Sequence, residues 1–228
     1  TMYVPSVTLD QFYGIEIEDF ACDVTRLSLW IAEHQMNVRL HREISDAVRP
    51  TLPLQHAGAI INGNSLRVNW KDVMPSATDD EVYLFGNPPY LGYSLQDETQ
   101  KEDMRETFEG VLGYKRLDYI SAWFYDARQY FTNLLNGGFA FVTTNSINQG
   151  EQVQNLWPHL KDKLYISFAY SSFRWTNNAK NNAAVIVSII GMKPKRTPDK
   201  TRPTLFVNDI KTQPDNINAY LIAGPDVI

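Results

Sequence analysis

The residues best suited to chemistry form a short run, Asn87-Pro88-Pro89-Tyr90, which follows an apolar stretch and precedes a polar loop. Two consecutive prolines fix their own φ angles and push the preceding residue into an extended conformation. The loop is therefore stiff, and it presents the Asn87 side-chain oxygen and the Pro88 carbonyl as fixed hydrogen-bond acceptors. Tyr90 adds a flat aromatic surface beside them. Such a group would hold a planar molecule by its exocyclic amino group.

The same run also has an ordinary structural interpretation. Pro-Pro after Asn is a common strand-ending turn in which the asparagine side chain bonds to its own backbone. A short motif therefore needs structural context. Here the context favours the chemical interpretation, because Val82-Tyr83-Leu84-Phe85 immediately upstream is typical of a buried strand.

The surrounding sequence alternates strand-like and helix-like segments. We expect strands at 12–17, 59–61, 82–85, 139–142, 165–170 and 184–190, and helices after Asp19, at 118–135 and at 153–160, with a helix or ordered loop at 96–109. This alternation predicts an α/β fold with helices on both faces of the sheet, in which the last two strands are antiparallel neighbours.

Local signals define the ends of these helices. Asp19 is a candidate cap for the first helix. The face expected to pack inward is traced by Phe20, Val24, Leu27, Ile31 and Gln35 and is widened by Leu29 and Trp30. Asn136-Gly137-Gly138 is a candidate C-terminal cap for the helix at 118–135. Ser146 and Gln149 fit a capping box ahead of the helix at 153–160.

Polar side chains follow two of the other expected strands. Ligands of α/β sheets bind beyond the carboxyl ends of the strands. Glu16 ends the first strand, and a carboxylate there can accept hydrogen bonds from both hydroxyls of a ribose. Asn64 follows the second and could pair with the amino edge of an adenine, with Ile17 packing on the ring. Glu16 could instead be an acid favoured by the dipole of the following helix.

Taken in order, these blocks resemble the S-adenosylmethionine-dependent amino methyltransferases, chiefly those acting on adenine in DNA. Asn87-Pro88-Pro89-Tyr90 resembles their catalytic motif, and Gly14-Ile15-Glu16 resembles their ribose-binding motif. Asn64-Ser65 is similar to the next motif, in which an aspartate is commoner at the position of Asn64. Asparagine still accepts through its carbonyl oxygen, but it carries no charge.

Three further blocks extend the resemblance downstream. Thr144-Asn145-Ser146-Ile147 with Gln149-Gly150-Glu151-Gln152 is similar to the large bacterial enzymes that fuse methyltransferase and restriction activities (type IIG-like), and to their relatives in phage defence. Phe173-Arg174-Trp175 resembles the loop that supplies an aromatic against the target base, although Phe173 could equally be a core aromatic. The block at 216–221 resembles the exit toward a target-recognition domain. This implies a methyltransferase portion at 1–192 and an exit segment at 193–228.

The resemblance implies a class I methyltransferase (Rossmann-like) sheet, with S-adenosylmethionine as cofactor and DNA as substrate. It assigns catalysis to Asn87, Pro88, Pro89 and Tyr90, cofactor binding to Glu16, Ile17, Asn64 and Ser65, and the target base to Tyr90 and Phe173. Cytosine in DNA, adenine in RNA and a protein glutamine present the same amino group, although asparagine before Pro-Pro favours adenine. A non-catalytic scaffold that binds DNA or partner subunits is the alternative from a different class.

One departure from the family is serious. The family opens with a strand and a glycine-rich loop that bind the methionine part of the cofactor, yet no G-x-G occurs in the sequence. We therefore expect that strand to lie upstream of Thr1, and the chain by itself to be an inactive fragment. In related folds the strand lies between those ending at Glu16 and Phe85. We expect these two either to pair directly or to have the gap filled by another segment or chain, because unpaired buried backbone is costly.

Composition limits the remaining choices. No stretch approaches the roughly 18 unbroken apolar residues of a membrane span, and no signal peptide is evident, so a cytoplasmic location is the default expectation. Cys22 is the single cysteine and the histidines show no ligand spacing, so no metal is implied. The net charge of −5 argues against a strong grip on DNA by this chain alone. The basic stretch at 193–202, which contains Lys193, Lys195, Arg196, Lys200 and Arg202, is either a solvated loop or an edge that follows phosphates.

Overall fold

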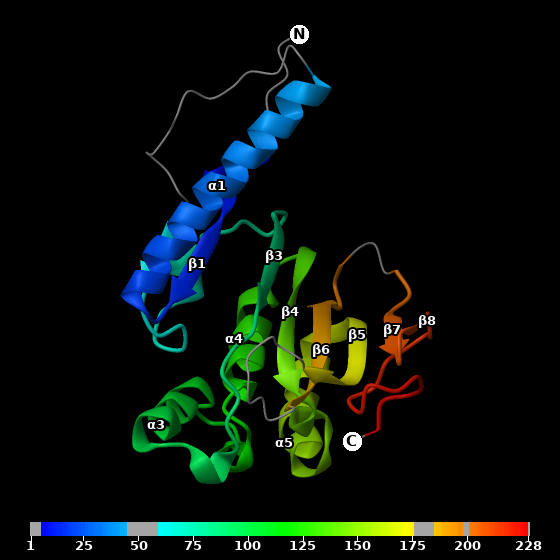
Figure 1. Ribbon diagram of the computed structural model, residues 1–228. Coiled ribbons are helices and arrows are strands. Elements are labelled where there is room, and N and C mark those ends of the chain that lie inside the picture. The colour runs from blue at the N-terminus through cyan, green and yellow to red at the C-terminus, as the bar shows by residue number, and fades with distance from the viewer. Residues whose placement is uncertain (1–5, 45–58, 176–184, 198–200, 228) are drawn as a thin grey trace. The chain divides into compact units, whose positions relative to one another are not determined.

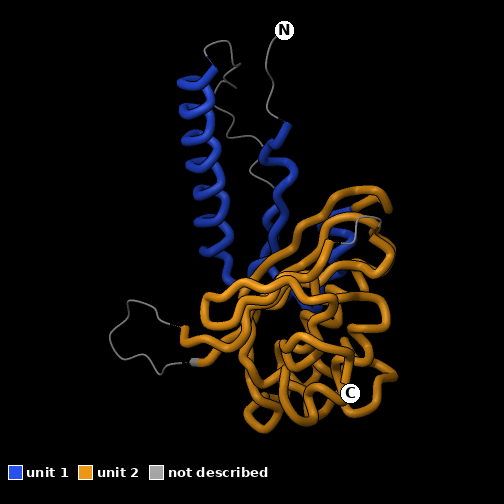
Figure 2. Tube along the Cα trace, turned by 90° about the vertical axis from the view of Figure 1, so that its right-hand side faces the viewer, with its two compact units in different colours: residues 1–75 blue, residues 76–228 orange. Residues whose placement is uncertain are grey.

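The computed structural model describes residues 6–44, 59–175, 185–197 and 201–227. The chain divides into two compact units, residues 1–75 and residues 76–228, shown in different colours in Figure 2. Lys200 and Ala184, which belong to two of the sequence predictions, lie outside the described residues. In the part of the chain that the structure describes, no helix is both long enough and apolar enough to cross a membrane.

The first unit contains a two-stranded parallel sheet and a long helix. Its elements are the 3₁₀-helix η1 (Leu9–Gln11), β1 (Tyr13–Glu16), α1 (Asp19–Glu43), β2 (Ala59–Asn62) and the short α2 (Trp70–Val73) (Figure 1). β1 and β2 run in the same direction, with Glu16 opposite Asn62. Both strands therefore end at the same edge of the sheet, as the sequence predicted.

Helix α1 covers the sheet with a face other than the predicted one. Phe20, Val24, Leu27 and Ile31 are 80%, 45%, 53% and 49% exposed. The covered face is offset by about two residues along the helix. It contains the buried Cys22, which the prediction left out, and the half-buried Leu29 and Trp30, which the prediction placed beside the stripe. The helix also begins after Glu18, with no side-chain capping bond, so Asp19 is its first residue and not its cap.

The second unit contains a six-stranded mixed sheet in the order β3-β4-β6-β5-β7-β8 (Figure 1). The strands are β3 (Glu81–Gly86), β4 (Asn136–Thr144), β5 (Leu164–Trp175), β6 (Val185–Pro194), β7 (Thr204–Val207) and β8 (Ile210–Thr212). β3 is parallel to β4 and β5 to β7, while the β4/β6, β5/β6 and β7/β8 pairs are antiparallel. The predicted α/β class and the antiparallel hairpin are confirmed, but β5 and β6 are followed by two more strands.

The helices of this unit are α3 (Glu98–Thr107), α4 (Ser121–Phe131) and α5 (Gly150–Lys163), with 3₁₀-helices η2 (Tyr93–Leu95), η3 (Tyr114–Arg116) and η4 (Asn145–Asn148). Phe124 of α4 meets Phe141 of β4 edge to face, with ring centroids 5.2 Å apart. Val153, Leu156, Trp157 and Leu160 bury one face of α5, at the spacing of an amphipathic helix. These contacts place the core between the helices and the central strands.

The expectation that β1 and β3 pair directly, or that another segment or chain fills the gap between them, stays a prediction. β1 pairs with β2 and β3 pairs with β4, each inside the sheet of its own unit. Within the described residues no strand lies on the second edge of β3. Tyr83 and Phe85 on this strand are 66% and 84% exposed. Among the described strands, that edge of β3 is therefore unpaired.

Gly137 and Gly138 belong to β4 and do not cap the preceding helix as predicted. Gly137 has a φ of 84°, and a Cβ atom there would lie 1.8 Å from the carbonyl oxygen of Val82. The glycine is therefore required by the close approach of β3, because only a residue without a side chain fits such a contact.

Candidate active site

The Asn87–Tyr90 run lies directly after the carboxyl end of β3, where the sequence placed it. Asn87 is exposed, Pro88 is buried, Pro89 is exposed and Tyr90 is half-buried. The Asn87 side chain makes no hydrogen bond with any described residue. An exposed amide beyond a strand end is free to accept hydrogen bonds from a ligand.

The chain immediately after Tyr90 is fixed through both polar groups of the Leu91 backbone. The Leu91 N–H donates to Asp118 Oδ1 at 2.9 Å. The Leu91 carbonyl accepts from the Tyr119 N–H at 2.9 Å and from Gln96 Nε2 at 3.2 Å. Three bonds to one residue anchor the loop at the point where it leaves the strand end.

Asp118 and Gln96 are functional candidates that the sequence analysis missed. Both are polar side chains that the structure buries, with 6% and 7% exposure. Asp118 stands between Leu117 and Tyr119 in an apolar run. A charged residue in such a run is a signal for a buried, hydrogen-bonded group, because an unpaired buried charge is costly.

The predicted cofactor residues Glu16, Ile17, Asn64 and Ser65 belong to the first unit. Asn62 Nδ2 donates to the carbonyls of Glu16 and Ile17, at 3.2 and 2.9 Å, and so joins the two strand ends. The Ile17 side chain is 65% exposed at this edge. The structure thus brings these four residues to one end of the β1-β2 sheet.

Two of these polar side chains also bond locally. Glu16 Oε1 accepts from the Glu18 N–H at 3.1 Å, and Asn64 Oδ1 accepts from the Leu66 N–H at 3.0 Å. A carboxylate has two oxygens with two lone pairs each, so this bond leaves further acceptor capacity on Glu16. Glu16 keeps the acceptors that a ribose needs.

Among the described residues, no group of His, Cys, Asp or Glu side chains is arranged to bind a metal ion.

The predicted capping box at Ser146 and Gln149 does not form. Helix α5 begins after Gln149 without a side-chain capping bond, and Ser146 lies in η4. The Ser146 hydroxyl instead bonds to Thr144 Oγ1 at 2.5 Å and to Asp118 Oδ2 at 3.3 Å. A nearby carboxylate is a stronger acceptor for the hydroxyl than the competing backbone groups.

Phe173, Arg174 and Trp175 form the last three residues of β5, not a loop. The Phe173 ring is half-buried, and its centroid lies 6.5 Å from that of Trp175. In the basic stretch, Lys195 and Arg196 are exposed, and Arg202 lies 3.3 Å from Asp215. The alternatives given for Phe173 and for the basic stretch stay predictions.

A comparison with known protein families shows to which family the chain belongs. The family described as the DNA-methyltransferase domain of MmeI matches residues 3–206. This chain belongs to that family. The resemblance to methyltransferase domains of fused restriction–modification enzymes is therefore confirmed.

Two relatives show how this MmeI-type domain compares with longer proteins. It is 55% identical, over its whole length, to the DNA methyltransferase A of Bacillus subtilis (strain 168), of which it spans 26%. It is also similar to the type IIL restriction-modification enzyme MmeI, whose structure was solved in complex with DNA. The TM-score is 0.84 at 36% identity, over 97% of this chain and 30% of that one. The chain thus spans less than a third of either relative.

Membership of the MmeI-type family is consistent with the α/β fold and the mixed sheet found here. The assignments of Asn87–Tyr90, of Glu16, Ile17, Asn64 and Ser65, and of Phe173 stay predictions. The division into portions at 1–192 and 193–228 also stays a prediction.

Proposed function

We propose that this domain takes part in transferring a methyl group from S-adenosylmethionine to the exocyclic amine of adenine in DNA, in restriction–modification or phage defence. The observation that carries the proposal is the exposed Asn87 side chain beyond β3, followed at once by the anchored Leu91. Family membership supports a DNA methyltransferase.

The proposed chemistry rests on two acceptors. The adenine amine is a poor nucleophile, because its lone pair is delocalised into the ring. Asn87 Oδ1 and the Pro88 carbonyl accept its two N–H hydrogens and so favour a pyramidal nitrogen with a localised lone pair. When bound, the cofactor supplies an electrophilic methyl on a sulfonium. The domain contributes position and fixed dipoles, effects that supply several kcal/mol in enzymes.

The target base must leave the duplex to reach these acceptors, as it does in methyltransferases as a class. Tyr90 is half-buried and adjacent to the acceptors, so its ring can stack on the extruded base. Such stacking contributes about 1–3 kcal/mol per base. Phe173 is the second candidate for this contact.

Glu16 and Asn64 are the proposed cofactor groups of the first unit, with Ile17 packing on the adenine of the cofactor. Their fit rests on the shared strand edge and on the exposed Ile17 side chain. Because the sequence contains no G-x-G loop, we expect the chain by itself to bind S-adenosylmethionine weakly and to transfer no methyl group.

The decisive experiment replaces Asn87 in the full-length protein. Asn87→Ala should lower methyl transfer to DNA adenine by roughly 100-fold or more while cofactor affinity stays within about twofold, because only an acceptor acting on the base is lost. Asn133→Ala is the matched control, since Asn133 is an exposed asparagine in the turn after α4. Unchanged turnover in Asn87→Ala would rule out the proposed role.

The same assay separates the alternatives. Product analysis after methylation distinguishes adenine from cytosine, RNA or a protein glutamine. Calorimetry with S-adenosylmethionine tests the scaffold alternative: failure of the full-length protein to bind the cofactor would favour a non-catalytic role.

A further inference from the structure

Asp118 makes hydrogen bonds to several separate segments of the second unit. Its carboxylate accepts from the N–H groups of Leu91 and Ile120, at 2.9 and 3.2 Å, and from the Ser146 hydroxyl at 3.3 Å. Its own N–H donates to Gln152 Oε1 at 3.0 Å. Through its carboxylate and its own N–H, Asp118 therefore joins the loop after Tyr90 to two blocks that lie far downstream in the sequence.

Those two blocks are the Thr144–Ile147 and Gln149–Gln152 segments, which the proposed chemistry leaves without a role. Ser146 is held by Thr144 and reaches Asp118. Gln152 accepts from the Asp118 N–H and donates to the Arg116 carbonyl at 2.7 Å. Both blocks thus act on the segment at 116–118, which in turn holds Leu91.

We propose that Asp118 is a positioning residue for methyl transfer, and that Ser146 and Gln152 act on the Asn87–Tyr90 loop through it. This inference rests on the function proposed above. The carboxylate fixes the backbone at Leu91 and with it the direction of the Tyr90 ring and the Pro88 carbonyl. It does not touch the reacting atoms.

A carboxylate suits this position for a physical reason. It is an acceptor with two oxygens, and it faces three donors in a site that is only 6% exposed. Hydrogen bonds to an ionised group are roughly twice as strong as those between neutral groups. Gln96 adds two further bonds, because its side-chain amide donates to the carbonyls of Leu91 and Leu117, at 3.2 and 3.0 Å.

The asparagine variant offers a graded test. Asp118→Asn keeps one carbonyl oxygen for the Leu91 and Ile120 N–H groups, and its amide nitrogen can donate to the Ser146 hydroxyl, which accepts as well as donates. Asp118→Ala removes every one of these bonds. The order wild type, Asn, Ala is therefore expected for any property that depends on the Leu91 anchor.

The first measurement is amide hydrogen exchange of this chain. Asp118→Ala should speed exchange of the Leu91 amide by roughly tenfold or more, with Asp118→Asn in between, since loss of the acceptor opens that site locally. Lys161→Met is the control, because it disturbs a buried charge with no bond to Leu91. Equal exchange at Leu91 in all four proteins would overturn the inference, whatever the enzyme does.

The second measurement is kinetic and uses the full-length protein. Asp118→Ala should lower kcat by about 10- to 100-fold with the affinity for S-adenosylmethionine unchanged, because misplacement of about 1 Å costs that much. Asp118→Asn should recover part of kcat. If Asp118→Ala does not fold, Ser146→Ala and Gln152→Ala provide the milder test, with smaller losses in the same direction.

The outcomes separate this inference from the proposed function. An inactive Asn87→Ala protein together with a fully active Asp118→Ala protein would sink the positioning role alone. An active Asn87→Ala protein would sink the proposed function, while faster exchange at Leu91 would still establish the anchor.

Discussion

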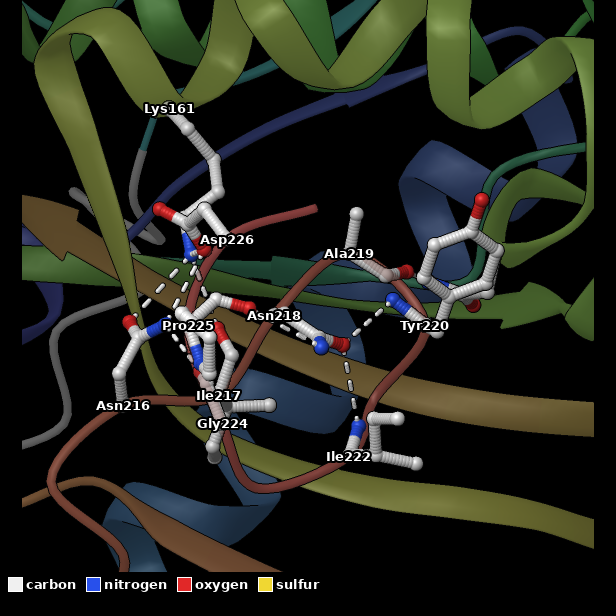
Figure 3. A network of polar contacts seen from close by, with 11 residues as sticks. Lys161, Asn216, Ile217, Asn218, Ala219, Tyr220, Ile222, Gly224, Pro225 and Asp226 are labelled. Atoms are coloured by element: carbon white, nitrogen blue, oxygen red, sulfur yellow. Dashed lines mark hydrogen bonds and ion pairs between the residues drawn. The ribbon is translucent and has the colours of Figure 1, made fainter. Parts of the chain in front are cut away.

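Two regions of the second unit are organised around a buried charge, and the signs of the charges are opposite. At Asp118 a carboxylate accepts from the N–H groups of Leu91 and Ile120. At Lys161 an ammonium donates to the carbonyl of Ile217 at 2.9 Å and to Asn216 and Asp226. Figure 3 shows the Lys161 network, in which the C-terminal segment folds around the side chain.

The difference lies in which backbone groups each segment leaves unpaired. In the loop after Tyr90, the Leu91 N–H donates to the Asp118 carboxylate and not to a strand. In the segment at 216–226, the Ile217 carbonyl accepts from the Lys161 ammonium, whose side chain is 7% exposed. Each irregular segment is thus held by a charge matched to its own orphan groups, as buried polar atoms require.

The C-terminal segment also has neutral supports, as Leu91 has in Gln96 and in the Tyr119 N–H. Asn218 Oδ1 accepts from the N–H groups of Tyr220 and Ile222, and Asn148 Nδ2 donates to the Ala219 carbonyl at 2.8 Å (Figure 3). Ile217 and Leu221 are buried beside them. We expect either segment to lose order in stages, because each is held by one charged side chain and by several neutral groups.

The largest effect is expected at Lys161. Lys161→Met leaves the buried Ile217 carbonyl without its donor, and we expect the free energy of unfolding to fall by about 2–4 kcal/mol. Lys163→Met is the matched control on the same helix, because Lys163 is 49% exposed and pairs with Asp162 at the surface. Denaturant titration measures the change. An equal loss in both variants would show that the network adds nothing beyond surface charge.

Another carboxyl group, that of Asp126 on α4, is half-buried and has no hydrogen-bond donor among the described residues. Burial raises the pKa of this carboxyl to about 7. A raised pKa means that the folded state keeps a proton the unfolded chain has lost, so stability falls as the pH rises from about 4 to 7.

Asp126→Asn should therefore stabilise the protein at pH 8 by roughly 1–3 kcal/mol and should change little at pH 4. Thermal unfolding at the two pH values checks this, with Asp162→Asn as an exposed control. A stabilisation that does not depend on pH would mean that ionisation of Asp126 is not its source. The gain in stability of Asp126→Asn would then come from packing and not from the loss of a charge.

A smaller effect on stability is expected at Gln152, whose side-chain oxygen accepts from the Asp118 N–H. Gln152→Ala removes the acceptor for the Asp118 N–H and the donor for the Arg116 carbonyl, and should cost about 1 kcal/mol. Glu151→Ala is the control, since both side chains of its ion pair with Arg116 are exposed and the pair should contribute little to stability. Exchange at Leu91 should rise only in the Gln152 variant.

The smallest effect on stability is expected at Asp226 as the pH is lowered. Burial alone would raise the pKa of Asp226, but hydrogen bonds from Lys161 and Asn216 and the nearby positive charges outweigh it and lower the pKa. The contribution of Asp226 is therefore present above about pH 4 and is lost as the pH falls through its lowered pKa.

Because Asp226 is largely solvated, this contribution should be less than about 1 kcal/mol after screening. Faster exchange of the amides at 217–224 between pH 5 and pH 2.5, abolished in Asp226→Asn, would show it. The loop at Leu91 provides the internal comparison within the same experiment.

The sequence predicted the strands and the position of the Asn87–Tyr90 loop well, because both depend on local patterns. β3 and the two prolines follow from apolar residues and fixed φ angles. It failed where the answer depends on a distant neighbour. Gly137 was assigned to a helix end, because the close approach of Val82 cannot be seen in the local sequence.

The same limit explains the missed site residues. Ser146 has the spacing of a helix cap, yet a carboxylate 28 residues upstream takes its hydroxyl. On α1, the stripe beginning at Phe20 has the period of a packed face, but which face is covered is decided by the sheet beside it. Periodicity gives a helix two sides and does not say which one is inside.

The open edge of β3 has a practical consequence for anyone who purifies this chain alone. A row of backbone donors and acceptors that pairs with no described strand, on a strand that carries the exposed rings of Tyr83 and Phe85, is a template for pairing between molecules. We expect light scattering to reveal self-association that grows with concentration. A charged substitution such as Phe85→Lys should suppress it, which would make crystallisation and spectroscopy of the chain practicable.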